Sequence, residues 1–396
     1  MSRIRRMLIA AATALIGAGV FSGPAWAHGL RVSGPSQAMA STEAQVTTLA
    51  TGLDNPRDIA LAPWGGGIFV AEAGHGADPG SKECVPAAEA GEEPTCVGFT
   101  SGISRINGSS RHRILSGFVS LAEPSGFAAL GISGIDASWW GNFATVDESA
   151  AGIPPEAAKF VTPETFNRAK AQLGRLIGFG ENGGYRTLAD VGDFDFRWTD
   201  EHKSLVPEQF PDANPYAVMH SGQATWVIDA GANTLDRVNS WGNVSVETFF
   251  PNPPVSDSVP TCIDRGPDGA FYVSDLTGAG NAAGAGVVWR VVPGQAPTVW
   301  ATGLTSVNGC GFGPDGQFYA TELSTKNLIE AEPGTGAVVR VAPHSSTPTP
   351  IVEHLSFPAG FAASKDGTIY VSNWGIAPAN SGGGPTGEVL KITLPH

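Results

Sequence analysis

The sequence predicts an all-β protein, a β-propeller of six four-stranded blades. An apolar strand, a turn of the Pro-Asp-Gly type and a second apolar strand ending in a polar or acidic residue recur six times. A third strand with a basic residue before an apolar one follows each copy. A period of roughly 40–50 residues with four short strands per unit is typical of a propeller.

The first two strands of each unit define the repeat. The clearest copies are residues 262–275 (CIDRGPDGAFYVSD), 310–322 (CGFGPDGQFYATE) and 361–373 (FAASKDGTIYVSN). Looser copies are residues 58–72, 134–147 and 217–229. A Gly-containing turn between two apolar runs predicts a β-hairpin at each place.

The third and fourth strands complete the units. The third strands carry Arg105-Ile106, Arg175-Leu176, Arg237-Val238, Arg290-Val291, Arg340-Val341 and Lys391-Ile392. Fourth strands follow in the first five units, whereas the last unit ends without one. Residues 45–53 (QVTTLATGL) match the fourth-strand pattern, so we expect the N-terminal strand to complete the sixth blade beside residues 387–394. This arrangement removes exposed sheet edges.

The rest of the chain divides simply. Arg5-Arg6, an apolar run and Ala25-Trp26-Ala27 predict a signal peptide over residues 1–27, and therefore an exported protein. Residues 28–43 are small and polar and predict a flexible leader, followed by a single domain over 44–396. Within it, the pattern predicts one helix over 163–174, with Thr162 as its N-cap.

Charge and cysteine content limit the partners. The formal charge of −14 disfavours nucleic acid and anionic membranes, and no apolar run in the mature chain is long enough to span a bilayer. Four cysteines in an exported chain indicate disulfides. Cys84 and Cys96 lie close together in one loop and are expected to pair. Cys262 and Cys310 are offset by one repeat position, which turns side chains to opposite strand faces, so their pairing stays open.

One face of the ring is the candidate functional surface. The connections from strand 4 to strand 1 and the long connections from strand 2 to strand 3 (73–102, 148–172, 276–286, 323–336 and 374–386) all reach it. Long loops on a rigid scaffold commonly carry binding sites. The second strands end there in Glu72, Asp147, Asp229, Asp275, Glu322 and Asn373.

Two interpretations of these acids are open. Five carboxylates around one axis could hold a divalent cation such as Ca²⁺, which prefers oxygen ligands. Alternatively, each acid forms an ion pair with the basic residue of the third strand in its own blade. The second interpretation is preferred because the pattern keeps the symmetry of the ring, and no metal is assigned.

Further polar residues lie in the connections between blades. Asn55, Arg57, Asp58, Asn214 and Asn308 are candidate ligand residues at the channel mouth, although Asn55-Pro56 and Asn214-Pro215 also fit simple turns. No metal-binding histidine spacing or nucleophile elbow is present. Trp64, Trp139, Trp140, Trp226, Trp289 and Trp374 could stack on carbohydrate, but large aromatic residues between blades are expected to belong to the core.

Several segments together resemble the ScyD/ScyE family of exported proteins, whose repeats are related to NHL repeats. The resemblance rests on TGLDNPRDIALAP (51–63), FVAEAG (69–74), DANPYAV (212–218), VIDAGANTLDRV (227–238), GPDGAFYVSDLTG (266–278) and VVWRVVPG (287–294). It covers about residues 44–394 and implies an exported six-bladed propeller. It supplies no reaction and no catalytic residues.

Three functions therefore compete. The first is a binding or scaffold protein that presents the loop face to a small molecule, a glycan or a protein. The second is a metal-dependent lactonase or hydrolase of the gluconolactonase kind, with a cation on some of the acids. The third is a quinone-dependent sugar oxidoreductase, for which only Arg57 and His75 are suitable. The sequence favours binding, and leaves open whether the protein is an enzyme.

Overall fold

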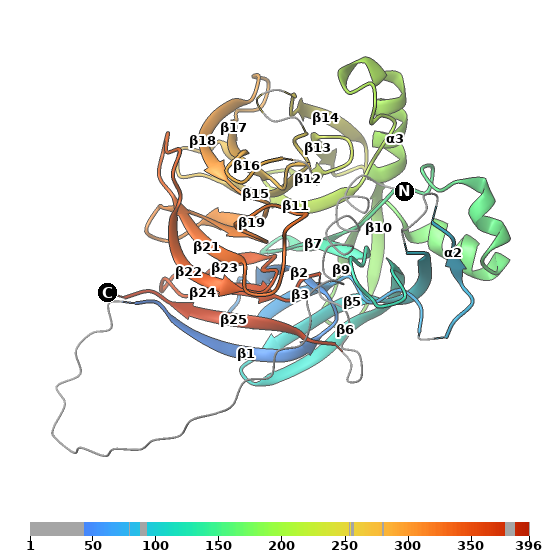
Figure 1. Ribbon diagram of the computed structural model, residues 1–396, viewed down its shortest axis with the longest axis horizontal. Coiled ribbons are helices and arrows are strands. Elements are labelled where there is room, and N and C mark those ends of the chain that lie inside the picture. The colour runs from blue at the N-terminus through green and yellow to red at the C-terminus, as the bar shows by residue number, and fades with distance from the viewer. Residues whose placement is uncertain are drawn as a thin grey trace.

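Six antiparallel sheets of four long strands form a ring in the computed structural model (Figure 1). The structure describes residues 43–78, 80–87, 93–252, 254, 257–278, 281–376 and 385–395. The predicted six-bladed propeller is therefore confirmed. The expected signal peptide (1–27) and leader (28–43), Glu43 apart, lie outside the described residues.

The blades follow the chain in order, and blade I has an extra short strand, β4. Blade I contains β2 (Pro56–Leu61), β3 (Ile68–Glu72), β4 (Cys84–Val85), β5 (Thr95–Asn107) and β6 (Ser110–Ala122). Blade II contains β7 (Ile132–Ser138), β8 (Gly141–Val146), β9 (Arg175–Phe179) and β10 (Tyr185–Asp190). Blade III contains β11 (Pro215–Ser221), β12 (Ala224–Asp229), β13 (Thr234–Asn239) and β14 (Val244–Phe249).

The second half of the ring repeats the same order. Blade IV contains β15 (Pro260–Arg265), β16 (Phe271–Asp275), β17 (Gly286–Val291) and β18 (Thr298–Leu304). Blade V contains β19 (Val307–Phe312), β20 (Phe318–Glu322), β21 (Gly336–Val341) and β22 (Thr349–Leu355). Blade VI contains β23 (Phe361–Ala363), β24 (Ile369–Asn373), β25 (Gly387–Thr393) and β1 (Gln45–Leu53).

The N-terminal strand lies in the same sheet as the last three strands. β1 pairs antiparallel with β25, from Gln45 opposite Thr393 to Leu53 opposite Gly387, and is the outermost strand of blade VI (Figure 1). The two ends of the described fold are thus held together by backbone hydrogen bonds.

Burial follows the position of each strand in its blade. The second strands β3, β12, β16 and β20 are buried along their whole length, because neighbouring blades cover both of their faces. The outer strands β10 and β22 are exposed over half or more of their residues, and β14 is mostly half-buried. The core therefore lies between blades, as the continuous apolar runs of the second strands require.

One helix matches the prediction and one does not. Helix α2 (Pro163–Gln172) begins after Thr162, whose side chain accepts a hydrogen bond from Thr165 N. Helix α3 (Val191–Glu201) was not predicted, because Phe194, Phe196 and Trp198 alternate with polar residues as in a strand. Its buried positions instead follow a helical spacing: Val191, Asp195 and Thr199. Two 3-10 turns, η2 (Pro155–Lys159) and η3 (Lys203–Leu205), adjoin these helices.

Blade I also differs from the expected loop pattern. β5 begins at Thr95, so the connection after β3 is shorter than the predicted 73–102. β5 and β6 are 13 residues each and form a long hairpin. No helix in the described part of the chain is long and apolar enough to cross a membrane.

Both cysteine pairs form disulfides. Cys84 and Cys96 join β4 to β5, as predicted. Cys262 and Cys310 join the first strands of blades IV and V, with Cα atoms 5.7 Å apart. The offset that left this pair open concerns faces within one sheet, whereas these strands belong to different sheets. Two disulfides suggest a protein that folds in an oxidising, extracellular environment.

Candidate functional site

The polar residues that end the second strands fasten the connections between blades. Glu72 Oε2 accepts a hydrogen bond from Asp54 N at 2.7 Å, and Asp229 Oδ1 accepts one from Asn214 N at 2.7 Å. The other four make equivalent bonds: Asp147 with Gly131 N, Asp275 with the Ser258 hydroxyl, Glu322 with Thr305 N, and Asn373 with Ser356 N. Each side chain thus accepts a hydrogen bond from a backbone N–H or hydroxyl group that lies shortly before the first strand of its own blade.

Burial dominates the electrostatics of these acids. It raises the pKa of Asp147, Asp275 and Glu322 to about 7, although hydrogen bonds oppose the shift. It also raises the pKa of Glu72. The acids are held apart, each in its own blade. Within the residues that the structure describes, no three histidine, cysteine, aspartate or glutamate side chains are grouped to hold a metal ion.

The expected ion pairs between second and third strands do not form. The register places Arg290 opposite Tyr272, three residues before Asp275, so the base lies at the other end of the strand. Arg290 instead contacts Asp268 at 2.7 Å. Glu72 does contact an arginine, but this is Arg113 of the fourth strand, at 3.1 Å. The prediction was wrong because it counted residues without the cross-strand register.

The candidate ligand residues in the connections between blades form hydrogen bonds that fix these connections and the loop end of the channel. The Asn55 amide donates to Gly74 O and Gly126 O, and Asn214 Oδ1 accepts from Glu148 N. Asn308 Oδ1 accepts from the Tyr216 hydroxyl at 2.8 Å, a bond between blades V and III. These contacts give Asn55, Asn214 and Asn308 structural roles at the loop end of the channel.

Arg57 is buried beside them. Its side chain is 2% exposed and donates from Nη2 to Ala129 O. Its charge opposes the burial-driven rise in the pKa of Asp147 and Tyr216. Among the described residues, Arg57 Nε and Nη1, Asp147 Oδ1 and Asn214 Nδ2 have no hydrogen-bond partner. A polar ligand that completed these bonds would be held strongly, because unpaired buried polar atoms are costly.

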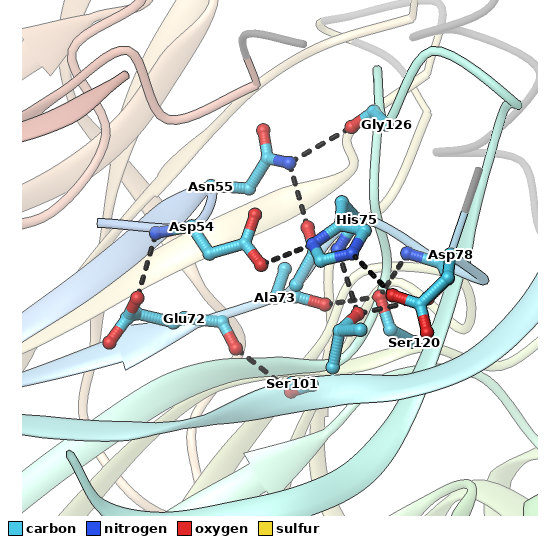
Figure 2. Close-up of polar contacts among 12 residues, drawn as sticks. Asp54, Asn55, Glu72, Ala73, His75, Asp78, Ser101, Ser120 and Gly126 are labelled. Atoms are coloured by element: carbon cyan, nitrogen blue, oxygen red, sulfur yellow. Dashed lines mark hydrogen bonds and ion pairs between the residues drawn. The ribbon is translucent and has the colours of Figure 1, made fainter. Parts of the chain in front are cut away.

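A histidine–aspartate pair lies on the loop face of blade I (Figure 2). His75, three residues after β3, places Nδ1 2.5 Å from Asp54 Oδ2. The backbone N–H of Asp54 is fixed by Glu72, and the backbone N–H of His75 donates to Thr100 Oγ1 at 2.9 Å. The His75 side chain is 24% exposed and that of Asp54 only 7%. The pair is therefore anchored on its aspartate side and open on its histidine side.

The geometry suits proton transfer. The hydrogen bond to Asp54 raises the pKa of His75, and burial opposes this rise. Asp54 holds the proton on Nδ1, so that Nε2 can accept or donate a second proton. Nε2 lies 3.7 Å from Asp78 Oδ1 (Figure 2). The Asp78 side chain is 89% exposed, so the surroundings of Nε2 reach solvent.

Sequence reasoning considered His75 only for quinone chemistry and missed its partner. Asp54 and His75 lie in the strand 4–1 and strand 2–3 connections of the same blade, which share one face of the ring. That shared position was the available signal. It needs the blade topology, because the two residues are 21 apart in sequence.

The channel itself contains a cavity of about 290 Å³. First strands of all six blades line it, from Tyr216 and Asn308 at the loop end to Leu61 and Phe312 at the hairpin end. Asp58 belongs to this lining, together with Asp136 and Asp264. Because the residues at the hairpin end are half-buried, the cavity opens on the face opposite the long loops.

Comparisons with known proteins bear on the fold. No family model matches the chain, and no curated protein matches it. Among solved structures, a proposed oxidoreductase (glucose dehydrogenase) from Thermus thermophilus is 13% identical over 88% of this chain and 100% of its own, with a TM-score of 0.52.

Two further structures are similar over comparable lengths. A proposed gluconolactonase is 11% identical over 89% of this chain and 93% of its own, with a TM-score of 0.49. The PQQ-bound aldose sugar dehydrogenase from Streptomyces coelicolor is 11% identical over 90% and 100%, with a TM-score of 0.48. At these identities the likeness shows the propeller fold alone.

Proposed function

We propose that the protein is an enzyme that hydrolyses a small ester or lactone, with His75 as the general acid–base and Asp54 as its orienting partner. The observation that carries the proposal is the 2.5 Å contact between His75 Nδ1 and Asp54 Oδ2, with the imidazole open to solvent on its other side. A lactonase is also the activity named for one of the similar propellers. The likeness to that propeller concerns only the fold, so the roles of His75 and Asp54 follow from their own contacts.

The chemistry follows from the two nitrogens of the imidazole. Neutral His75 takes a proton from water at Nε2 while the water oxygen bonds to the carbonyl carbon. The ester C–O bond then breaks, and Nε2 returns the proton to the leaving alkoxide oxygen. Asp54 stabilises the imidazolium formed between these steps. The hydrogen bond from Asp54 raises the pKa of His75, which makes Nε2 a stronger base toward the proton of the attacking water.

A metal-dependent mechanism does not fit the acids that the sequence singled out. Glu72, Asp147, Asp229, Asp275 and Glu322 lie in five different blades, and each is bonded to its own blade connection. Their oxygens do not converge on one point. We therefore assign no catalytic step to Ca²⁺ or another cation, and no step to a quinone.

Hydrolysis can be tested on glucono-δ-lactone and γ-butyrolactone with a pH indicator, and on p-nitrophenyl acetate by nitrophenolate absorbance, with and without a chelator. We expect His75→Asn to lower kcat about 100-fold or more, and Asp54→Asn to lower it about tenfold or more. The matched control is His112→Asn, since His112 is an exposed histidine on β6, and it should leave kcat unchanged. Activity that survives in His75→Asn, or that the chelator abolishes, would contradict the proposal.

Binding without turnover is the second candidate function. It is favoured by the 290 Å³ channel cavity, which is separate from the histidine pair and has its own polar lining. If no ester is hydrolysed and a small ligand protects the protein against thermal unfolding, binding is the better description. We also propose that the protein belongs to the ScyD/ScyE family and is exported by its N-terminal signal. The motifs in the sequence support both proposals.

A further inference from the structure

Three tryptophans are exposed on the hairpin face of blades I and II. The fractional exposures are 42% for Trp64, 75% for Trp139 and 80% for Trp140. Trp64 and Trp139 come from different blades, yet their rings contact edge to face with centroids 6.3 Å apart. These residues were expected in the core. Trp226 and Trp289 are indeed buried, but this group is not.

The position of two of them is unusual for the local structure. Trp139 and Trp140 are the two central residues of the turn that joins β7 to β8, since Ser138 pairs with Gly141. Turns are rich in Asn, Asp, Gly and Ser, and neither Trp139 nor Trp140 has a positive φ, so small polar residues would fit this turn equally well. Indoles contribute nothing to such a turn, and exposure of their apolar surface is unfavourable. A role in contact with a ligand accounts for their presence.

The hairpin turns that carry the tryptophans follow strands that line the channel cavity. Leu61 and Ala137 line the cavity, and Trp64 and Trp139 follow them by three and two residues. Because the first strands run from the loop face to the hairpin face, their last residues surround the cavity mouth. The aromatic group and the cavity mouth therefore lie on the same face of the ring.

The cavity offers hydrogen-bond acceptors and no basic side chain. Asp58, Asp136 and Asp264 line it, and the lining contains no lysine, arginine or histidine. Each aspartate accepts a backbone N–H from the next blade, namely Ile135, His220 and Phe312, at 3.2, 2.9 and 2.7 Å. The three carboxyl groups are thus held in fixed positions, and each oxygen has further acceptor capacity.

We propose that this face binds the end of a neutral glycan chain. Sugar rings present C–H faces that pack on indoles, and their hydroxyls donate to carboxylates. A cavity of about 290 Å³ is at the small end for ligand sites, which suits a terminal sugar with the next residues on the tryptophans. Uronic acids and sulfated sugars are disfavoured above about pH 7, because burial raises the pKa of Asp58 to about 7 and that of Asp136 to about 6, and both are charged at higher pH.

Charge also distinguishes this ligand from a lipid surface. The formal charge of the chain is −14, which opposes binding to anionic membranes. The site lies on the opposite face from His75 and does not depend on the proposed hydrolysis.

Affinity electrophoresis tests the proposal with native gels that contain galactomannan, xyloglucan, dextran or polygalacturonate. We expect retardation by at least one neutral polysaccharide and none by polygalacturonate. Trp64→Ala and Trp139→Ala should each weaken the apparent affinity about tenfold or more. The matched control is Trp241→Ala, because Trp241 is 87% exposed but lies in a strand 3–4 turn of blade III.

A double variant separates binding from folding. Trp139→Ser with Trp140→Asp places small polar residues in a turn whose central residues have no positive φ, so the protein should stay about as stable as the wild type while glycan binding is lost. The absence of retardation by any neutral polysaccharide would overturn the proposal, as would equal loss in Trp241→Ala. Tryptophan-dependent flotation with phosphatidylcholine vesicles in place of glycan binding would also overturn it and identify a membrane site.

Discussion

Two groups of aspartates near the loop face show opposite uses of the same side chain. In blade I, Asp54 holds a half-buried histidine and leaves it open to solvent. In blade III, Asp229 and Asp236 face Asp195 of helix α3, and all three are completely buried. The blade I aspartate presents a titratable histidine at the surface, whereas the three blade III carboxyl groups are shielded from solvent.

The sheet explains how the blade III group assembles. Asp229 lies opposite Thr234 and Val227 opposite Asp236 in the β12–β13 register. Residues two apart share a strand face, so Asp229 and Asp236 lie on the same side of the sheet. Helix α3 brings the Asp195 carboxyl within hydrogen-bonding reach of both. Burial and the closeness of the three carboxyl groups favour their protonated forms.

The lesson is that partner and exposure decide what an aspartate does. Burial and the neighbouring carboxylates raise the pKa of Asp195 and Asp236. Asp54 has a histidine beside it and raises the pKa of that histidine instead. The following predictions test this contrast, beginning with the largest effect.

Asp229→Ala should produce the largest loss of stability. Asp229 Oδ1 accepts hydrogen bonds from the backbone N–H groups of Asn214, Gly231 and Ala232. Removal of the acceptor leaves three buried donors unpaired, and the free energy of unfolding should fall by about 4 kcal/mol. Urea denaturation measures it. Asp200→Ala on the exposed end of α3 is the control and should change it by less than about 0.5 kcal/mol.

Stability should fall as pH rises from about 4 to about 7. The folded pKa of Asp229 is raised to about 6 from 3.8, and those of Asp195 and Asp236 are raised as well. A folded pKa above the unfolded value means that the folded chain binds more protons in this interval. The stabilisation is therefore complete below pH 4 and is lost as pH increases.

Asp195→Asn identifies the source of this dependence. The amide donates to the neighbouring carboxylates without a titrating proton, so the Tm at pH 7 should rise by about 2 °C or more and its decline with pH should become shallower. Calorimetry between pH 4 and 8 measures both. An unchanged decline would show that the other buried acids, Asp58, Asp147 and Asp275, account for it, since their pKa values are also raised to about 7.

Asp54→Asn should have a smaller effect on stability and a clear effect on titration. Loss of the carboxylate should bring the pKa of His75 back toward 6.5 or below, as followed by the NMR shift of its imidazole protons. Because the histidine pKa is raised in the folded state, the pair stabilises the fold at low pH and loses that contribution as pH rises through the folded pKa. A His75 pKa that does not move would remove the basis for its proposed role.

Asp78→Asn should have the smallest effect. Its carboxylate is 3.7 Å from His75 Nε2 and almost fully exposed, so solvent screens the interaction. The free energy of unfolding should change by less than about 0.5 kcal/mol, and the His75 pKa should fall less than in Asp54→Asn. A larger fall would mean that Asp78, and not Asp54, controls the histidine.

Local sequence patterns were sufficient to predict the ring and most of its strands. The six hairpins, the basic third strands and the helix after Thr162 follow from local patterns of period two and from turn and cap residues. These patterns depend only on residues that are close together in the sequence. The Cys84–Cys96 bridge was predictable for the same reason, since both residues belong to one loop.

The tertiary structure alone decided which side chains meet. The acids at the ends of the second strands bond to blade connections instead of third-strand bases, His75 meets Asp54, Cys262 meets Cys310, and Trp64 meets Trp139. These contacts depend on register and on the angle between neighbouring blades. A strand pattern contains neither, because the alternation of side chains gives the face of a residue but not the partner that faces it.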